Sequence, residues 1–370
     1  MKLIITKENL IKALQKIIGV VEKKQAMPIL SHVLFIKNPS GFEVVASDLE
    51  VQLSSSIKID EEQDFNENIV IPGRKLFDIA KGLPEGSLLE IERKEAGKIQ
   101  IKSAKSKFLL VTLDAKGFPL MDVDSESNVN FLINTSVLKD IINKTAFAMA
   151  QQDIRYYLNG LFISINKKEM LGVATDGHRL AKTKGDIKGD SEKLINAIIP
   201  RKGVNEIDKQ LQDEDDETDI RISKNHILVI SKDSRAISKL VDGTFPDFEK
   251  VISVSTDKKA VVDVKVFKEA LSRVSILSND RFRGIKLNFE ENEIKISANN
   301  PEKEEASDDI KAEYLGGSLE VGFNVNYLVD ILNVIKTKNV EILLKDANSS
   351  AILKPENDNV SCYVVMPLRL

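Results

Sequence analysis

The stretch TKENLIKALQKIIGVV (6–21) decides the fold, because it occurs three times along the chain. The two later copies are NTSVLKDIINKTAFAM (134–149) and DVKVFKEALSRVSIL (263–277). The matching leucine or phenylalanine positions of the three copies are 128 and 129 residues apart. Self-similarity at a fixed period is typical of repeated structural units, and this period is close to one third of the 370 residues.

Further blocks recur in the same order after each copy. The first set is MPILSHVLFI (27–36), RYYLNGLFISI (155–165) and RFRGIKLNF (281–289). The second set is VVASDLE (44–50), GVATDGH (172–178) and ISANNPE (296–302). The third set is IPGRKLFDIAKGL (71–83), IPRKGVNEIDKQL (199–211) and GFNVNYLVDILNVI (322–335). Each third then ends in a β-rich stretch with GFPLM, TFPDF or VVMPL. We predict three copies of one domain, at 1–126, 127–252 and 253–370, with one boundary near the turn-rich MDVDSESN (121–128) and the other at VISVSTDKK (251–259).

Periodicity predicts the elements of each copy. The first block places its apolar residues at helical spacing, so we expect an amphipathic helix that begins after Thr6 as N-cap. The GRKLFDIAKGL type of block predicts a second, shorter helix. The segments EIKISA (293–298), HILVIS (226–231) and IQIKSAKSKFLLVTL (99–113) are typical of strands, the last being a hairpin with a lysine-rich turn. Each copy is therefore expected to be an α+β domain with two helices packed on β-sheets.

Composition excludes several classes of protein. Hydrophobic residues make up 42% and charged residues 30%, which predicts folded domains rather than disorder. Cys362 is the only cysteine and the three histidines do not cluster, so we predict no disulfide, no metal site and no cofactor. The N-terminal apolar stretch is too short for a signal peptide, and no uncharged apolar stretch approaches 18 residues. We expect a cytoplasmic protein that does not bind membranes.

Positive charge gathers on the six expected helices. They carry a net charge of +10 in a chain whose total is −4, which leaves −14 for the remainder. If these helices share one side of the assembly, that side offers phosphates a positive surface, suited to sequence-independent contacts with a nucleic-acid backbone. For any one helix alone, a solvated polar face is the simpler interpretation. The acidic run QDEDDETD (212–219) is interpreted as a solvated loop, because its spacing does not match a calcium-binding loop.

The segment ATDGHRLA (174–181) is the most enzyme-like part of the chain, because it brings Asp176, His178 and Arg179 close together. An acid–base site needs a poised histidine with an orienting carboxylate in a cleft. The structural alternative is a turn in which Gly177 adopts unusual backbone angles and the polar residues fix the loop. No nucleophile motif or phosphate-binding loop accompanies the segment, so we favour the turn.

At this segment the sequence closely resembles the bacterial DNA polymerase III beta subunits, the β sliding clamps, and the resemblance runs from end to end. The matching stretches are MPIL (27–30), SDLE (47–50), GRKLFDIAKGLPEG (73–86), QDIRYYLNG (152–160), ATDGHRLA (174–181), PRKGV (200–204), SKLVDGTFPDF (238–248), ILSNDRFRG (276–284), ANNPEKEEA (298–306), GFNVNYLVDILN (322–333) and YVVMPLRL (363–370). The resemblance implies a head-to-tail homodimer, a six-domain ring with helices around the hole and sheets outside. Such a ring encircles duplex DNA without reading its sequence. The resemblance therefore implies a cytoplasmic protein that is associated with the nucleoid. It would tether the replicative polymerase catalytic subunit, the clamp loader and other clamp-binding proteins through short linear motifs, and make or break no bond itself.

The resemblance also implies three sets of site residues. The expected partner-peptide positions are Thr175, Gly177, His178, Arg179, Leu180, Pro246, Val251, Val364, Met366, Pro367 and Leu368. The expected DNA-binding positions are Lys24, Arg74, Lys81, Gln152, Tyr156, Tyr157, Arg201 and Lys202. The expected dimer-interface positions are Lys75, Lys105, Lys107, Phe108, Leu110, Ile276, Leu277, Glu302 and Glu304.

Each set has a plainer alternative. Val364 and Leu368 could be core residues at a strand end, and Tyr156 and Tyr157 could be strand residues with one buried ring. The lysine-rich KSAKSK and the acidic PEKEEASDD could be ordinary solvated turns rather than complementary surfaces. The sequence also departs from the family pattern. Leu368 replaces the familiar methionine, which conserves volume. Lys24 and Lys81 replace arginines, so the charge is kept and the bidentate fork is lost.

Two other functions stay open on the sequence alone. The first is a hydrolase that uses the ATDGHR segment, with the repeats serving only as architecture. The second is a repeat scaffold that binds peptides but not DNA. The missing nucleophile counts against the first, and the recurrent basic helices count against the second.

Overall fold

The structure is a computed structural model that describes residues 2–22, 27–38, 41–58, 67–95, 97–121, 129–211, 216–253 and 255–369, with residues 190–193 described only as backbone. The chain divides into two compact units. Unit 1 comprises residues 1–136, 187–190 and 202–240. Unit 2 comprises residues 137–186, 191–201 and 241–370. The middle third of the chain therefore contributes to both units.

The first third of the chain has two helices and two sheets. The helices are α1 (Lys7–Ile17) and α2 (Gly73–Gly82). One sheet has the order β1 (Lys2–Thr6), β6 (Leu88–Lys94), β7 (Lys98–Ser103), β8 (Ser106–Val111). The other strands run in the order β5 (Ile69–Pro72), β2 (His32–Asn38), β3 (Gly41–Ser47), β4 (Val51–Lys58). All neighbouring strands are antiparallel.

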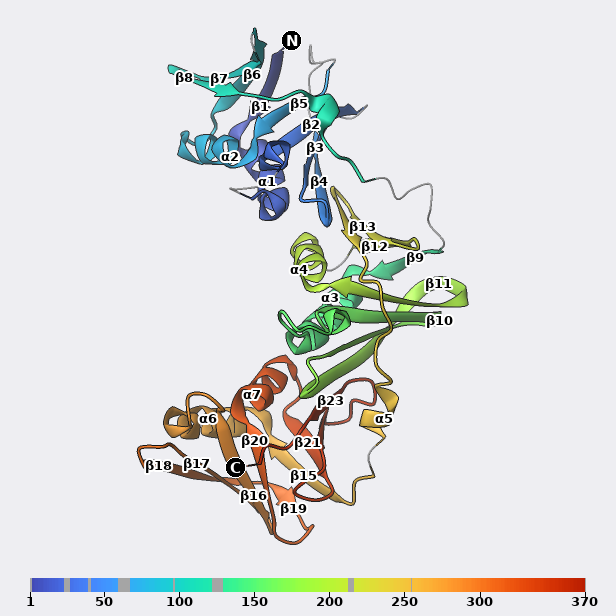
Figure 1. Ribbon diagram of the computed structural model, residues 1–370, viewed down its shortest axis with the longest axis vertical. Coiled ribbons are helices and arrows are strands. Elements are labelled where there is room, and N and C mark those ends of the chain that lie inside the picture. Colours follow the sequence, from blue (N-terminus) through green and yellow to red (C-terminus); the bar gives the residue numbers. More distant parts are fainter. Residues whose placement is uncertain are drawn as a thin grey trace. The chain divides into compact units, whose positions relative to one another are not determined.

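The middle third repeats this plan. Its helices are α3 (Thr135–Thr145) and α4 (Arg201–Gln210). One set of strands has the order β9 (Val129–Asn134), β12 (Glu217–Ile222), β13 (His226–Ser231), β14 (Ser234–Lys239). The second set is one long hairpin, β10 (Gly160–Thr175) with β11 (Arg179–Pro200). Figure 1 shows this hairpin in green and yellow-green.

The last third repeats the plan again. Its helices are α6 (Val264–Val274) and α7 (Val325–Val334). One set of strands has the order β19 (Glu313–Tyr314), β15 (Lys258–Asp263), β21 (Asn339–Leu344), β22 (Ala351–Pro355), β23 (Cys362–Val365). The other has the order β20 (Leu319–Asn324), β16 (Gly284–Glu290), β17 (Glu293–Asn299), β18 (Glu305–Lys311). The prediction of three α+β copies with two helices each is thus confirmed (Figure 1).

Short helical pieces complete the chain. One-turn 3₁₀ segments lie at Ile18–Val20, Pro28–Ser31, Ala115–Gly117, Ala146–Ala148, Tyr156–Leu158 and Ser275–Leu277. A four-residue helix, α5 (Glu249–Ile252), extends into the predicted boundary stretch 251–259. The turn-rich stretch predicted as the other boundary, 121–128, lies outside the described residues from 122 onward. Among the described residues, no helix is long and apolar enough to cross a membrane.

Side-chain caps fix where the long helices begin. Thr6 Oγ1 accepts a hydrogen bond from the Asn9 backbone N–H at 3.3 Å, which confirms the predicted N-cap of α1. Asp263 accepts from the backbone N–H groups of Lys265 and Val266 at the start of α6. Asn324 caps α7 in the same way. The capping residue is polar in each case and is the last residue of a strand, so the strand-to-helix joint is built alike in these copies.

Main-chain ladders join consecutive copies of the repeat. In unit 1, β14 pairs antiparallel with β4, with Ser238 opposite Val51. In unit 2, β23 pairs antiparallel with β11, with Val365 opposite Arg179. In each case the last strand of one copy pairs with the strand that follows the SDLE or TDGH turn of the copy before it. Strands β8 and β18 hold the corresponding places at the two ends of the series, and each is the edge strand of its described sheet.

A close approach of strand and helix in unit 2 gives a stability prediction. A Cβ atom on Gly172 would lie 2.5 Å from Ile141 Cγ2, because β10 lies close to α3. We expect Gly172→Ala to lower the free energy of unfolding by about 1–3 kcal/mol through overpacking. A Cβ atom on Gly82, the last residue of α2, would meet no other atom within 4 Å, so Gly82→Ala should change this free energy by less than about 1 kcal/mol. Urea unfolding followed by circular dichroism distinguishes the two. Equal stability of both variants would contradict the described packing.

Candidate functional site

The turn between β10 and β11 is built by its own polar side chains. Asp176 Oδ1 accepts hydrogen bonds from the backbone N–H groups of His178 and Arg179, at 2.9 and 3.0 Å. Thr175 Oγ1 accepts from the Gly177 N–H at 3.1 Å and donates to the Arg179 carbonyl oxygen at 2.6 Å. Gly177 has a φ of +89°, which favours glycine. The structural alternative for ATDGHRLA, a turn fixed by polar residues, is therefore confirmed.

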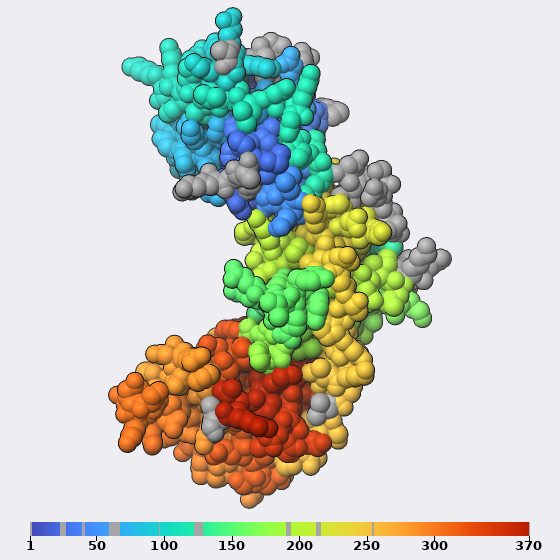
Figure 2. Space-filling model, viewed as in Figure 1, coloured from blue at the N-terminus to red at the C-terminus, as the bar shows by residue number. Residues whose placement is uncertain are grey.

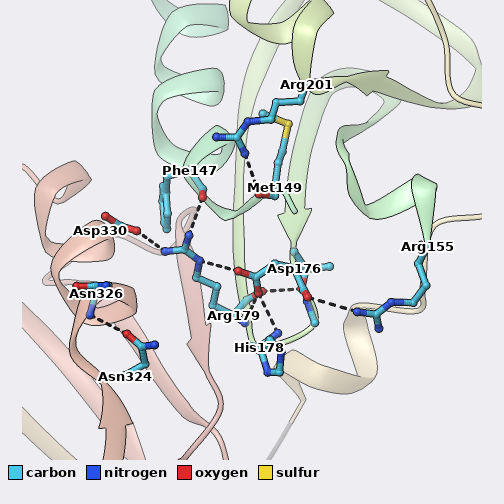
Figure 3. A network of polar contacts seen from close by, with 12 residues as sticks. Phe147, Met149, Arg155, Asp176, His178, Arg179, Arg201, Asn324, Asn326 and Asp330 are labelled. Atoms are coloured by element: carbon cyan, nitrogen blue, oxygen red, sulfur yellow. Dashed lines mark hydrogen bonds and ion pairs between the residues drawn. The ribbon is translucent and has the colours of Figure 1, made fainter. Parts of the chain in front are cut away.

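Arg179 ties this turn to the last third of the chain. Its Nε donates to Asp176 Oδ2 at 3.1 Å, and its Nη2 donates to the Phe147 carbonyl oxygen at 2.9 Å. Its Nη1 donates to Asp330 Oδ2 on α7, and the guanidinium carbon lies 4.7 Å from the centre of the Tyr327 ring. Figure 3 shows the guanidinium between Asp330 on one side and Asp176 on the other. Because the Arg179 side chain is only 11% exposed, these contacts hold it in one orientation.

Beside this turn lies a cavity of about 160 Å³, which we call the apolar pocket. It contains nine of the eleven predicted peptide positions: Thr175, Gly177, His178, Arg179, Leu180, Pro246, Val251, Val364 and Met366. Arg155, Tyr157, Leu158 and Phe248 also line it, and the sequence did not predict them for this site. Pro367 and Leu368 are not among the lining residues. Both are half-buried, and the Leu368 N–H donates to the Gly322 carbonyl oxygen at 2.8 Å.

The floor of the apolar pocket is part of the hydrophobic core. Leu180 and Val364 face each other across the β11–β23 ladder, and both belong to a buried cluster with Phe162 and Phe245. Val364 is therefore a buried core residue at a strand end, as the plainer alternative predicted. The same side chain also lines the apolar pocket. Met366 is 42% exposed, and its N–H donates to the His178 carbonyl oxygen at 2.9 Å. Figure 2 shows the dark-red end of the chain at the surface.

One end of the apolar pocket carries an oriented cation. Arg155 Nε and Nη2 donate to the two carboxylate oxygens of Asp153, at 3.1 and 2.9 Å. These bonds lower the pKa of Asp153 to about 2, and they raise the pKa of Arg155. Arg155 belongs to the stretch QDIRYYLNG (152–160), one of those that carry the family resemblance. Its place in the pocket depends on the 3₁₀ turn that follows it, which the sequence did not predict.

The arrangement does not resemble an acid–base site. The Asp176 carboxylate is bonded to Arg179 and to backbone N–H groups, and the His178 ring stacks on Tyr327 with the ring centres 6.4 Å apart. Within the described ranges, no group of three or more His, Cys, Asp or Glu residues is arranged to hold a metal ion. The hydrolase hypothesis therefore gains no support from the geometry.

The predicted DNA positions lie on several elements. Arg74 and Lys81 are exposed on α2, and the Lys81 ammonium lies 4.6 Å from the centre of the Phe77 ring. Gln152 is exposed with a φ of +56°. Tyr156 and Tyr157 lie in a 3₁₀ turn, so the strand alternative was wrong for them; Tyr156 is 59% exposed and Tyr157 half-buried. Lys24 lies outside the described residues.

Arg201 and Lys202 also contact other parts of the chain. Arg201 Nη1 donates to the Met149 carbonyl oxygen at 2.9 Å, in unit 2. Lys202 forms ion pairs with Asp48 at 2.6 Å and with Glu22 at 3.2 Å, in unit 1. Burial by itself would lower the pKa of Lys202, but the two carboxylates outweigh burial and raise it. Any contact of Lys202 with a phosphate would compete with these carboxylates.

The predicted dimer positions lie on β8 and the turn before it, on α2, in the last 3₁₀ turn and in the segment before β18. Lys105 and Lys107 are exposed at the β7–β8 turn and on β8, and Phe108 and Leu110 are half-buried on one face of β8. Ile276 is 76% exposed beside a half-buried Leu277 in the last 3₁₀ turn. The remaining predicted positions, Lys75, Glu302 and Glu304, are exposed. Of the acidic run 212–219, residues 212–215 lie outside the described residues. Residues 217–219 belong to strand β12, so the prediction of a loop was wrong for them.

Comparison with known proteins gives one consistent family. Three family models match in succession: the N-terminal domain of the DNA polymerase III beta subunit at residues 1–122, the central domain at 132–247 and the C-terminal domain at 249–369. A curated relative from Pseudomonas aeruginosa, named beta sliding clamp, is 43% identical over 366 residues, with 99% of each chain covered.

Solved structures agree with this match. A crystal structure of the DNA polymerase III subunit beta from Pseudomonas aeruginosa has a TM-score of 0.95 and 42% identity, with 100% of both chains covered. A structure of the sliding clamp from the same organism bound to griselimycin has a TM-score of 0.96 and 43% identity, again with 100% of both chains covered. The likeness therefore extends over the whole chain and all three repeats.

The contacts of Arg179 give a prediction about stability. Removing the guanidinium leaves the largely buried Asp176 carboxylate without its charge partner, so Arg179→Met should lower the free energy of unfolding by about 2–4 kcal/mol. Asp330 is 40% exposed on its side chain, and Asp330→Asn should cost less than about 1 kcal/mol. Arg155→Met, at an exposed arginine of the same pocket, serves as the matched control with a similarly small cost. Denaturant unfolding measures all three, and an Arg179→Met variant as stable as Arg155→Met would contradict the described network.

Proposed function

Because this chain belongs to the bacterial DNA polymerase III beta subunit family and is a sliding clamp, we propose that two copies close head to tail into a six-domain ring around duplex DNA. The observation that carries the proposal is the unbroken succession of the three domain models along one chain. The ring would hold on to DNA by topology rather than by tight binding. It would keep a tethered polymerase at a high effective concentration beside the DNA, which gives processivity.

The repeated ladders support a head-to-tail closure. Each internal junction pairs the last strand of one copy with the strand after the turn of the preceding copy, as β14 does with β4 and β23 with β11. Edge strand β8 corresponds to β14 and β23, and edge strand β18 corresponds to β4 and β11. Pairing β8 of one chain with β18 of a second chain would repeat the internal junction. When the rotation between the two chains lets both junctions form at once, the assembly closes after two copies.

The chemistry of the two edges supports the same pairing. Lys105 and Lys107 accompany β8, whereas β18 is preceded by Glu302 and Glu304, so opposite charges would meet. Phe108 and Leu110 would meet the exposed Ile276 and its neighbour Leu277, which removes apolar surface from water. Covering both edges would also satisfy backbone groups that are otherwise open to pairing with any strand.

Contacts with DNA are proposed to be electrostatic and sequence-neutral. The exposed Arg74 and Lys81 on α2 and the exposed Gln152 and Tyr156 are suited to the sugar–phosphate backbone. Contacts of this kind position a protein without reading bases, and they depend strongly on salt. We place the protein at the nucleoid in the cytoplasm for this reason.

Partner proteins are proposed to dock in the apolar pocket through short linear motifs. A cavity with aliphatic and methionine walls accepts apolar side chains, and a methionine thioether adapts to several ligands. The candidate partners are the replicative polymerase catalytic subunit, the clamp loader and other clamp-binding proteins. In this proposal the clamp is not an enzyme: Asp176, His178 and Arg179 shape the pocket, and no bond is made or broken.

Charge reversal at the proposed closure tests the assembly. We expect the wild-type protein to have a mass of about twice 41.2 kDa in solution at micromolar concentration, with a central hole in its small-angle X-ray scattering profile. Lys105→Glu with Lys107→Glu should weaken the dimer about tenfold or more, because like charges would then face each other. Adding Glu302→Lys and Glu304→Lys should restore it. A wild-type particle of 41.2 kDa would contradict the ring.

An apolar variant separates this interface from general surface effects. Ile276→Ala with Leu277→Ala should also favour the monomer, whereas Leu315→Ala, at an 82% exposed leucine outside the proposed contact, should not. If the Ile276 and Leu277 variant dimerises as tightly as the Leu315 variant, the assignment of the interface is wrong.

A pair of methionines tests the docking site. Met366 lines the apolar pocket and is 42% exposed, and Met27 is 41% exposed on unit 1. We expect Met366→Ala to weaken binding of a peptide of the QLxLF type about fivefold or more, equivalent to about 1 kcal/mol. Met27→Ala should leave it unchanged. Fluorescence anisotropy of a labelled peptide measures both, and equal affinities would mean that the peptide binds elsewhere.

A further inference from the structure

A second hollow adjoins the apolar pocket in unit 2. It has a volume of about 370 Å³, and its lining combines lysines with aliphatic side chains. The lysines are Lys182, Lys184 and Lys354, and the aliphatic residues are Leu171, Leu194, Ile252 and Val360. We call it the lysine pocket.

The two pockets lie on one face of the same pair of strands. Residues two apart on a strand point to the same side, so Leu180 and Lys182 on β11 share a face, as do Val364 and Cys362 on β23. Leu180 is opposite Val364 and lines the apolar pocket, and Lys182 is opposite Cys362 and lines the lysine pocket. Helix α5 contributes to both, with Val251 in the first and Ile252 in the second. A chain leaving the apolar pocket along this face therefore meets the lysines next.

The lysine pocket has an excess of positive charge. Glu169 is the one carboxylate among its described lining residues, and it pairs with Lys184 at 2.5 Å. Lys182 pairs with Glu249 at 2.8 Å. Both carboxylates are at least half exposed, and such surface pairs exchange partners at little cost.

The positive charge of Lys354 is the least neutralised of the three lysine charges. No carboxylate of the described chain lies within ion-pair distance of its ammonium group. Burial raises the pKa of the Cys362 thiol, and the charges of Lys354 and Lys182 act in the opposite direction. The ammonium groups thus lie close enough to the strand face to act on a group buried in it.

We propose that the lysine pocket binds acidic side chains of the same linear peptide whose apolar residues fill the apolar pocket. This inference rests on the proposed docking function and adds a partner chemistry to it: an acidic flank beside the apolar motif. Strands rise about 3.3 Å per residue, so Lys182 lies about 7 Å and Lys184 about 13 Å along β11 from Leu180. An extended peptide covers these distances in about two to four residues, which sets where the acidic positions fall.

Labelled peptides test the proposal on the full-length protein. The core peptide is Gln-Leu-Ser-Leu-Phe, and two extended peptides carry Asp-Glu-Asp either before or after it. Matched controls carry Asn-Gln-Asn at the same end. We expect one of the acidic peptides to bind about fivefold more tightly than its amide control at low salt, as two exposed ion pairs would give. The gain should disappear at about 0.5 M salt, where exposed charges are screened.

Variants locate the effect. Lys354→Gln with Lys184→Gln should abolish the gain and leave the affinity for the core peptide unchanged, because neither residue lines the apolar pocket. Lys286→Gln, at a lysine of β16 whose side chain is 43% exposed, is the matched control and should keep the gain. Thermal unfolding checks that each variant remains folded.

The outcomes separate this inference from the docking function. If the core peptide binds and neither acidic extension exceeds its amide control, the lysine pocket does not read an acidic flank, and the docking function stands. If the gain survives in the Lys354 and Lys184 double variant, the acidic residues bind elsewhere and the inference is equally wrong. If the core peptide itself fails to bind the wild-type protein, the docking function fails and this inference fails with it.

Discussion

Backbone pairing between consecutive repeats is the constraint on which the rest of the structure depends. The last strand of one copy pairs with the strand that leaves the turn of the copy before it, and the register relative to that turn is the same in both units: Ser238 opposite Val51, and Val365 opposite Arg179. Buried backbone groups need hydrogen-bond partners, and a slip of one residue would turn every side chain to the other face. The ladder therefore fixes which side chains meet at each junction. A few residue differences between the copies are then enough to form an apolar pocket at one junction.

A few residue differences between the copies make the two junctions chemically different. In unit 2 the ladder sets Leu180 beside Val364, and the face next to the turn is apolar. In unit 1 the corresponding pair is Gln52 and Ile237. There Gln52 Oε1 accepts a hydrogen bond from the Met121 N–H at 2.8 Å. The Gln52 amide is therefore hydrogen-bonded to the end of the first third of the chain. The scaffold repeats, while the side chains at the two junctions differ: Leu180 and Val364 line the apolar pocket in unit 2, and Gln52 and Ile237 line a hollow of about 150 Å³ in unit 1.

The sequence predicts the parts of the fold that local chemistry dictates. The three copies, their two long helices and the Thr6 cap follow from apolar spacing and from the hydrogen-bonding needs of a helix start, so they were predicted correctly. Helix α5 was missed because four residues are too few to show a helical period. Arg155 and Phe248 were missed as pocket residues for a different reason. Their place depends on a 3₁₀ turn and on α5, which bring them to the Leu180–Val364 face only after the chain has folded. The roles of the peptide-binding, DNA-binding and dimer positions were inferred from a resemblance and stay predictions.

A count of charged residues along the sequence overstates the positive charge that the helices can present to a phosphate backbone. Lys16 on α1 is buried in an ion pair with Asp233, and Lys202 on α4 pairs with Asp48; both carboxylates come from outside the helices. Arg74 donates to the Val21 carbonyl oxygen, and a neutral partner leaves its charge in place. The positive field of the helices is therefore weaker than a net count of +10 implies. A weak field suits a protein that must stay on DNA without holding one position, because each additional phosphate contact would have to be broken at every step along the duplex. Topology can supply retention, and the exposed cations then need only make weak, exchangeable contacts with the phosphates.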